Sequence, residues 1–233
     1  MVDMATMNSR RRGVISESPE TLTDQAYRRL EEMIVTLQLM PGDVLSEQAL
    51  STELDIGRTP IREALQRLAR EGLIVILPRK GILVSETNPR KQLLVLEARR
   101  EIERLLSRAG AKRRTEEQAS RLLVIADGME KVAKDNDDIA FMRLDHELND
   151  LVSESAHNEY ASRAMGLLHG LSRRFWYVHY KQTADMPLCA RLHAEQARAI
   201  AQGDAEGAAK AVDRLIDYTE TFARETLTSD LPR

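Results

Sequence analysis

The sequence predicts a mostly α-helical protein, in which an N-terminal winged helix-turn-helix precedes an all-α helical-bundle domain. Apolar residues recur at helical spacing in three segments before residue 72. Two β-rich runs follow, at 73–77 and 82–84, on either side of a basic loop that contains glycine, and they predict a β-hairpin wing. Beyond Glu86, amphipathic helical patterns dominate.

Length and composition favour two folded domains. The chain has 233 residues, which exceeds a typical single domain of about 100–200 residues. Hydrophobic residues make up 42% and charged residues 30%, as is ordinary for folded proteins. We expect a flexible N-terminal arm over 1–20, the winged helix-turn-helix over 21–86, and the all-helical domain over 89–228.

Cysteine content and hydropathy indicate a cytoplasmic protein. The single cysteine, Cys189, cannot form a disulfide within the chain. No stretch reaches the roughly 18 uninterrupted apolar residues of a membrane span. We therefore expect no membrane partner.

The first helix is expected over 23–37. Ala26, Leu30 and Ile34 recur on one face, and Thr23 can serve as the N-cap. The pair Pro41-Gly42 then breaks the helical pattern.

The second and third helices are separated by a short turn at 55–57. The second is expected to start at Ser46. The third is expected to be capped by Thr59, with Pro60 in its first turn and Gly72 just after its end. Its buried stripe is Ile61, Ala64, Leu65 and Leu68.

Six amphipathic helices are expected after the wing. Their predicted ranges are 89–113, 115–134, 139–155, 159–181, 187–202 and 205–227. This pattern is typical of an all-α bundle. Arginines and aromatics cluster at 173–180, and side chains at such helical spacing belong to a core more often than to a ligand site.

Local charge indicates a DNA-reading surface, although the formal net charge of the chain is −3. From residue 58 to residue 80 there are six basic and two acidic residues, a local balance of +4. A helix that enters the major groove needs hydrogen-bonding side chains on its outer face. We expect DNA contacts from the second helix, the third helix and the wing, at Gln48, Arg58, Thr59, Arg62, Gln66, Arg79, Lys80 and Gly81.

Two arginines of the third helix are the best candidates for base recognition. Arg58 and Arg62 could each bind guanine O6 and N7, because a guanidinium offers two parallel donors. Arg79 and Lys80, at the tip of the wing, could enter the minor groove or bind phosphate. The alternative for the wing pair is a solvated surface without a DNA contact.

These residues carry a family resemblance. The sequence at 45–50, Leu-Ser-Glu-Gln-Ala-Leu, and that at 58–65, Arg-Thr-Pro-Ile-Arg-Glu-Ala-Leu, resemble the N-terminal domain of the GntR family of bacterial regulators. Leu68 and the run 71–73 extend the resemblance, which covers about 21–84. It implies a transcriptional regulator that binds operator DNA. The family usually has serine where this chain has Gly57, which removes a possible phosphate-binding hydroxyl.

The helical remainder resembles the C-terminal effector domain of the FadR-type subfamily, known as the FCD domain. The matching residues lie at 96–103, 144–145, 157–158 and 203–205 and at His193. The resemblance implies a homodimer, with a central cavity that binds an organic acid or related metabolite. It points to Arg99, Asp145, Asn149 and His193 as effector-binding residues.

In many members of that subfamily, one aspartate and three histidines hold a divalent metal. Asp145 and His193 occupy two of those positions, whereas Asn149 and Leu215 stand where histidines are expected. An amide is a poor ligand for zinc-like ions, and leucine cannot coordinate. We expect no required cofactor. A divalent metal at Asp145 and His193 is the alternative.

Arg99 favours a small organic acid as the effector, because a guanidinium binds carboxylates well. An acyl-CoA or another metabolite is the alternative ligand, and an exposed ion pair with Glu103 is the alternative role of Arg99.

We expect a repressor and not an enzyme, since no nucleophile elbow, phosphate loop or zinc-protease motif is present. The rival functions are a metal-dependent enzyme fused to a winged helix, and a winged helix used for protein contacts alone.

Overall fold

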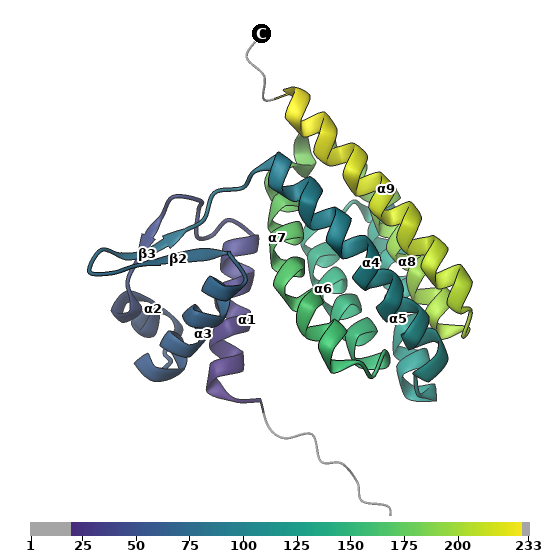
Figure 1. The fold of residues 1–233 in the computed structure, drawn as a ribbon, viewed down its shortest axis with the longest axis horizontal. Coiled ribbons are helices and arrows are strands. Elements are labelled where there is room, and N and C mark those ends of the chain that lie inside the picture. Colours follow the sequence, from purple (N-terminus) through teal and green to yellow (C-terminus); the bar gives the residue numbers. More distant parts are fainter. Residues whose placement is uncertain (1–19, 230–233) are drawn as a thin grey trace, which may run out of the picture.

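A computed structural model of the chain describes residues 20–229 (Figure 1). The N-terminal arm expected over 1–20 lies outside the described residues, apart from Glu20. A small α/β module, coloured purple to blue, stands beside a larger bundle of helices (Figure 1). The fold class is therefore the predicted one, a winged helix-turn-helix followed by an all-α bundle.

Helix α1 spans Leu22–Val35 and begins one residue earlier than expected. Thr21, not Thr23, is the N-cap, because the Thr21 side chain accepts a hydrogen bond from the Asp24 amide at 3.1 Å. Thr23 lies inside the helix, and its hydroxyl donates to Glu63 at 2.7 Å. The cap prediction was wrong because two threonines stand two residues apart and either could cap.

Helix α2, Glu47–Leu54, follows the N-cap Ser46 and ends at Asp55, which adopts a left-handed conformation. Helix α3 spans Arg58–Arg70, and its N-cap is Gly57 without a side-chain hydrogen bond. The expected Thr59 cap is therefore wrong, since Thr59 is already the second residue of the helix. Gly72 follows the helix with φ +78°, as its predicted capping position requires.

The wing belongs to a three-stranded antiparallel sheet in the order β1-β3-β2. Strands β2 (Ile74–Leu77) and β3 (Gly81–Val84) form the expected hairpin. Strand β1, Val44–Leu45, adds an edge that was not predicted, because two residues are too short to show strand alternation.

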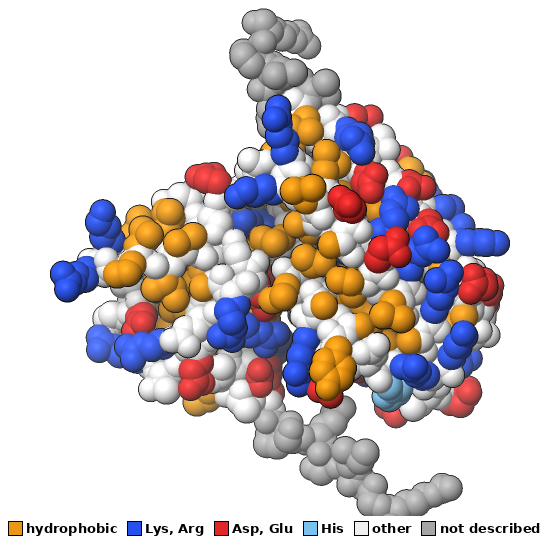
Figure 2. Space-filling view, in the orientation of Figure 1, with side chains coloured by type: hydrophobic (Ala, Val, Ile, Leu, Met, Phe, Trp, Pro, Cys, Tyr) orange, Lys and Arg blue, Asp and Glu red, His pale blue; other side chains and the backbone are white. Residues whose placement is uncertain are grey.

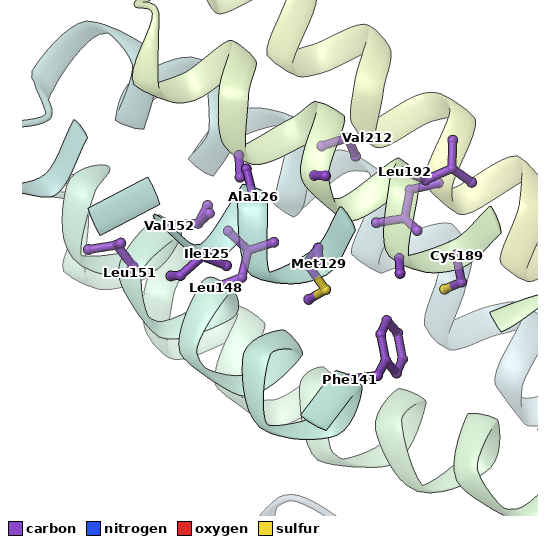
Figure 3. Close-up of a cluster of buried hydrophobic side chains, with 14 of the residues drawn as sticks. Ile125, Ala126, Met129, Phe141, Leu148, Leu151, Val152, Cys189, Leu192 and Val212 are labelled. Carbon is purple, nitrogen blue, oxygen red and sulfur yellow. The ribbon is translucent and has the colours of Figure 1, made fainter. Parts of the chain in front are cut away.

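The bundle consists of six helices among the described residues. They are α4 (Pro89–Arg113), α5 (Glu116–Asp135), α6 (Asp138–Ser155), α7 (Glu159–Thr183), α8 (Met186–Ala201) and α9 (Ala205–Ser229). Their apolar faces form one buried cluster, and Figure 3 shows Phe141 and Cys189 at one end of it. No described helix is long and apolar enough to cross a membrane.

The two modules pack together through α1 and α7, which lie side by side in Figure 1. Leu171 of α7 packs against the hydrophobic cluster of the winged helix, and Val35 of α1 belongs to the cluster of the bundle. Arg174 of α7 is buried and donates to the carbonyl oxygen of Leu73 at 3.1 Å. Burial lowers the pKa of Arg174 to about 10, which still leaves it charged at neutral pH. The position of the winged-helix module therefore depends on α7.

Two glycines of α7 test this packing. A Cβ added at Gly170 would lie 2.8 Å from Cδ1 of the buried Leu73, whereas one added at Gly166 would meet no described atom within 4 Å. Gly166→Ala should raise the free energy of unfolding by about 0.5–1 kcal/mol, since alanine favours the helix. Gly170→Ala should lower it by about 1–3 kcal/mol, the usual cost of overpacking. Denaturant titrations that find both variants equally stabilised would contradict the close contact.

Candidate functional site

The exposed face of α3 brings together four of the predicted DNA-binding side chains. Arg58, Thr59, Arg62 and Gln66 are all exposed, while the opposite stripe of the helix is buried. The Arg58 guanidinium contacts the side-chain oxygen of Gln48 on α2. Gln48 therefore lies beside the start of α3, the part of a recognition helix that contacts base edges in the major groove.

Arg62 is held by an acidic neighbour that the sequence reasoning did not single out. Its Nε and terminal nitrogen donate to the two carboxylate oxygens of Glu47 at 3.0 and 2.7 Å. The hydrogen bond with Arg62 lowers the pKa of Glu47. Because Arg62 is largely exposed and Glu47 partly exposed, this pair orients Arg62 but does little for stability.

The wing carries its two basic residues at the turn between β2 and β3. Arg79 and Lys80 are exposed, and Arg79 has a left-handed φ of +63°. Basic side chains stand at the end of the molecule where the hairpin projects (Figure 2). Gly81 has a structural reason to be glycine: its φ is +108°, and a Cβ there would lie 3.0 Å from the carbonyl oxygen of Leu45.

A cavity of about 40 Å³ lies inside the bundle, between α4, α6, α7, α8 and α9. Arg99, Asp145 and His193, three of the four residues predicted to bind an effector, line it, and so does Leu215. Asn149 does not line it but donates to Asp145 Oδ1 at 3.2 Å. Four aromatic side chains contribute to its walls, from Phe141, Phe175, Trp176 and Phe222.

Asp145 and His193 form a buried ion pair. His193 Nε2 lies 3.1 Å from Asp145 Oδ1, and its Nδ1 lies 2.8 Å from the carbonyl oxygen of Cys189. Burial by itself lowers the pKa of His193, but contacts with Cys189 and Asp145 outweigh it and hold that pKa well above the ordinary value. Both ring nitrogens then donate, so the imidazole is protonated at neutral pH.

Asp145 also accepts a hydrogen bond from Arg173, whose Nε lies 3.1 Å from Asp145 Oδ2. Burial would raise the pKa of Asp145, but His193 and the charge of Arg173 reverse this and lower it well below the ordinary range. The other side of the Arg173 guanidinium donates to Glu31 of α1 at 2.6 Å. Arg173 therefore joins the cavity to the DNA-binding module.

Arg99 is buried rather than exposed, and its Nε donates to Glu103 at 2.8 Å. Glu103 is buried too and also accepts from Gln196 at 3.1 Å. The ion pair with Glu103 is therefore real, but it lies at the cavity wall and not in solvent. The positive charge of Arg99 is already compensated by this partner.

The donors at the subfamily's metal position do not fit a divalent ion. Leu215 presents a hydrocarbon wall to the cavity, and Asp145 is engaged by two cationic side chains, Arg173 and His193. Within residues 20–229, no three His, Cys, Asp or Glu side chains are grouped so as to hold a metal. The Arg173 and His193 cations stand where a metal would otherwise balance the carboxylate.

Two further polar groups at or near the cavity were not among the predicted site residues, although one of them, Trp176, belongs to the cluster at 173–180 that its helical spacing assigns to the core. Trp176 lines the cavity, and its Nε1–H has no acceptor among the described residues. His169 of α7 is partly buried, and its shielded Nε2 has no partner in the described part of the chain. Burial, with the charge of Arg99, lowers the pKa of His169 to about 3, so this ring is neutral. Both are polar atoms that a bound ligand or water would satisfy.

Two family profiles match the chain in the order of its two modules. Residues 22–84 match the bacterial regulatory proteins of the gntR family, and residues 94–218 match the FCD domain. The chain belongs to the GntR family of transcriptional regulators. As a GntR-family regulator with an FCD domain, it binds DNA and controls transcription.

Relatives agree with this assignment. The chain is 27% identical over 209 residues to the transcriptional repressor RspR of Escherichia coli K12, covering 88% of this chain and 90% of that protein. It is 44% identical over 63 residues to a transcriptional regulator of an unstable DNA locus in Streptomyces ambofaciens, a match that spans 27% of either chain. The fold is similar to that of E. coli McbR/YncC, with a TM-score of 0.76, 17% identity, and coverage of 89% and 99%.

The raised pKa of His193 makes stability depend on pH. Its protonation contributes stability that is fully present below the unfolded pKa of about 6.5 and is lost as pH rises through the folded pKa. Above pH 6.5, the free energy of unfolding should therefore fall by up to about 1.4 kcal/mol per pH unit more in the parent than in His193→Gln. His169, with its lowered pKa, acts only below that window. Identical pH slopes in denaturant titrations of the two proteins would show that His193 is not protonated in the fold.

Proposed function

We propose that this chain is a homodimeric, cytoplasmic repressor that releases its operator when a small carboxylate binds in the helical domain. The observation that carries the DNA part is the two-sided character of α3. Its inner residues Ile61, Ala64 and Leu68 are fully buried, whereas Arg58 and Arg62 stand free of the core. Such a helix can enter the major groove without disturbing its own domain.

The recognition face supports specific rather than general binding. Glu47 fixes the Arg62 guanidinium before DNA arrives, and Gln48 does the same for Arg58. A pre-oriented arginine loses less conformational freedom when it grips guanine. Arg79 and Lys80 lie on the projecting wing, where they would bind phosphate or the minor groove.

A dimer follows from the geometry of operator reading. One chain has one recognition helix, and two half-sites one helical turn apart need two of them, related by a two-fold axis. The bundle has exposed apolar side chains on α4 and α7, including Leu94, Leu105 and Leu167. Hydrophobic side chains gather over this face in Figure 2, which is suited to a second copy of the chain.

The repressor role and the effector class rest on separate supports. RspR, similar over most of the chain, is named a repressor. The cavity of about 40 Å³ is far below the roughly 300–1,000 Å³ of drug-sized ligand sites. A small acid therefore suits this cavity better than an acyl-CoA does. The unpartnered Nε1–H of Trp176 is a donor for such an acid.

Substitutions on α3 and on the wing separate base reading from phosphate binding. Arg62→Ala should cost about 1–3 kcal/mol per recognition helix on operator DNA and less on random DNA, because it removes a base contact. Lys80→Ala should weaken both DNAs alike and reduce the salt dependence. Gel shifts with the DNA that flanks the gene, at several salt concentrations, measure both effects.

Two results would contradict the proposal, one from these gel shifts and one from light scattering. Equal losses on operator and random DNA for Arg62→Ala would make Arg62 a phosphate contact. A monomeric protein by light scattering, with full operator affinity, would exclude the dimer.

A further inference from the structure

A cleft between the two modules is large enough for a metabolite. It measures about 620 Å³ and lies between α1 on one side and α6 and α7 on the other. Most of the charge along its walls is basic, from Arg28, Arg29, Arg143 and Arg173. This volume falls within the range of about 300–1,000 Å³ that is common for small-molecule sites.

Arg173 lines both this cleft and the cavity of the bundle. On the cavity side its guanidinium donates to Asp145 at 3.1 Å and to the carbonyl oxygen of Met142 at 3.1 Å. On the cleft side it donates to Glu31 at 2.6 Å. The side chain is only 8% exposed, so these contacts have to balance its charge.

Glu31 is a carboxylate from the DNA-binding module that occupies an anion site of the bundle. It is buried, and Arg173 is its one ion-pair partner among the described residues. It also lies near a second buried carboxylate, Glu71, whose pKa is raised by burial, with a further rise from the charge of Glu31. Glu31 therefore depends on Arg173 for compensation of its charge, and a free carboxylate could take the same place.

We propose that the cleft is a carboxylate-binding site in which the ligand competes with Glu31 for Arg173. The ligand's carboxylate would bind the cleft side of the guanidinium, and its apolar part would lie against Ile139 and Tyr177, which line the same cleft. This inference rests on the proposed function, to which it adds a second place, beside the cavity of the bundle, where an acidic effector can act. It places the anchor at Arg173 and not at Arg99, which already has Glu103 as its partner.

Competition at Arg173 connects ligand binding to the DNA-binding module. The ion pair joins α1 to α7, and α1 packs directly against α3. A ligand that displaces Glu31 removes this link and leaves a buried carboxylate that favours separation of the modules. Ligand binding at Arg173 and the Glu31–Arg173 contact are then mutually exclusive, so the ligand changes operator affinity through its differential affinity for the arrangements with and without this contact.

The neighbouring arginines contribute unequally. Arg29 donates to the carbonyl oxygen of Leu54 at 2.7 Å, and Arg28 pairs with Glu20, so both are already occupied within the DNA-binding module. Arg143 of α6 is exposed and has no ion pair among the described residues. It attracts the ligand's carboxylate toward the cleft without holding a module contact of its own.

The test compares carboxylate binding in full-length variants that each lose one acid. Benzoate is the probe, benzamide is its neutral counterpart, and calorimetry measures both affinities. Glu31→Gln should bind benzoate at least about tenfold more tightly than the parent does, because the internal competitor loses its charge.

Glu32→Gln is the matched control: Glu32 lines the same cleft on the same helix, but it is exposed and makes no ion pair among the described residues. Its benzoate affinity should change by less than about threefold, and benzamide should not distinguish the variants.

Three outcomes would overturn the proposal. These are equal gains for Glu31→Gln and Glu32→Gln, no benzoate binding by Glu31→Gln at millimolar concentration, and a gain for Glu103→Gln in place of Glu31→Gln. The last result would move the carboxylate to Arg99. Operator gel shifts on the parent are run in parallel. A parent that fails to bind its operator refutes the proposed function, whereas the comparison of Glu31→Gln with Glu32→Gln still decides the site.

Discussion

The guanidinium of Arg173 is the point on which the arrangement of the two modules depends. It lies between a carboxylate of the bundle, Asp145, and a carboxylate of the DNA-binding module, Glu31. A buried charge without compensation costs several kcal/mol, and Glu31 has Arg173 as its one ion-pair partner among the described residues, so the place of Glu31 depends on this contact. The same contact thus shapes the cavity wall and orients the first helix of the winged helix-turn-helix.

The buried polar network around this contact is close to electrically neutral. Three cations, Arg99, Arg173 and the protonated His193, face three carboxylates at Glu31, Glu103 and Asp145. An anionic ligand that enters such a network has to displace an internal carboxylate or bring a proton with it. Displacement of Glu31 is the one such exchange that would also break a contact between the modules, because Glu103 and Asp145 both belong to the bundle.

A cation supplied by the chain also explains how the fold can do without the subfamily's metal ligands. Where leucine and asparagine replace two histidines, Arg173 and His193 provide the positive charge that Asp145 needs. The Arg173 guanidinium donates hydrogen bonds on two sides. One of them reaches Glu31 of the DNA-binding module. Charge compensation in the cavity and docking of the modules thereby become a single interaction.

Sequence reasoning predicted the elements well where several local signals agreed. The end of α3 at Gly72 and the start of α2 at Ser46 follow from capping chemistry, and the resemblance placed Asp145 and His193 in one cavity. It failed where one signal had two equivalent candidates, as with Thr21 and Thr23. It could not find the Glu31–Arg173 pair, because those residues are 142 positions apart and no pattern in the sequence connects them.

A double-mutant cycle on operator affinity tests most directly whether Arg173 couples the cavity to DNA binding. Asp145→Asn alters the cavity side of the guanidinium, and Glu31→Gln alters the side that holds the DNA-binding module. If Arg173 transmits the change, the effect of Asp145→Asn on operator affinity should largely disappear in the Glu31→Gln background. The coupling energy should then be about 1 kcal/mol or more. Effects that add within about 0.5 kcal/mol would contradict the coupling and would leave the Glu31–Arg173 contact as packing alone.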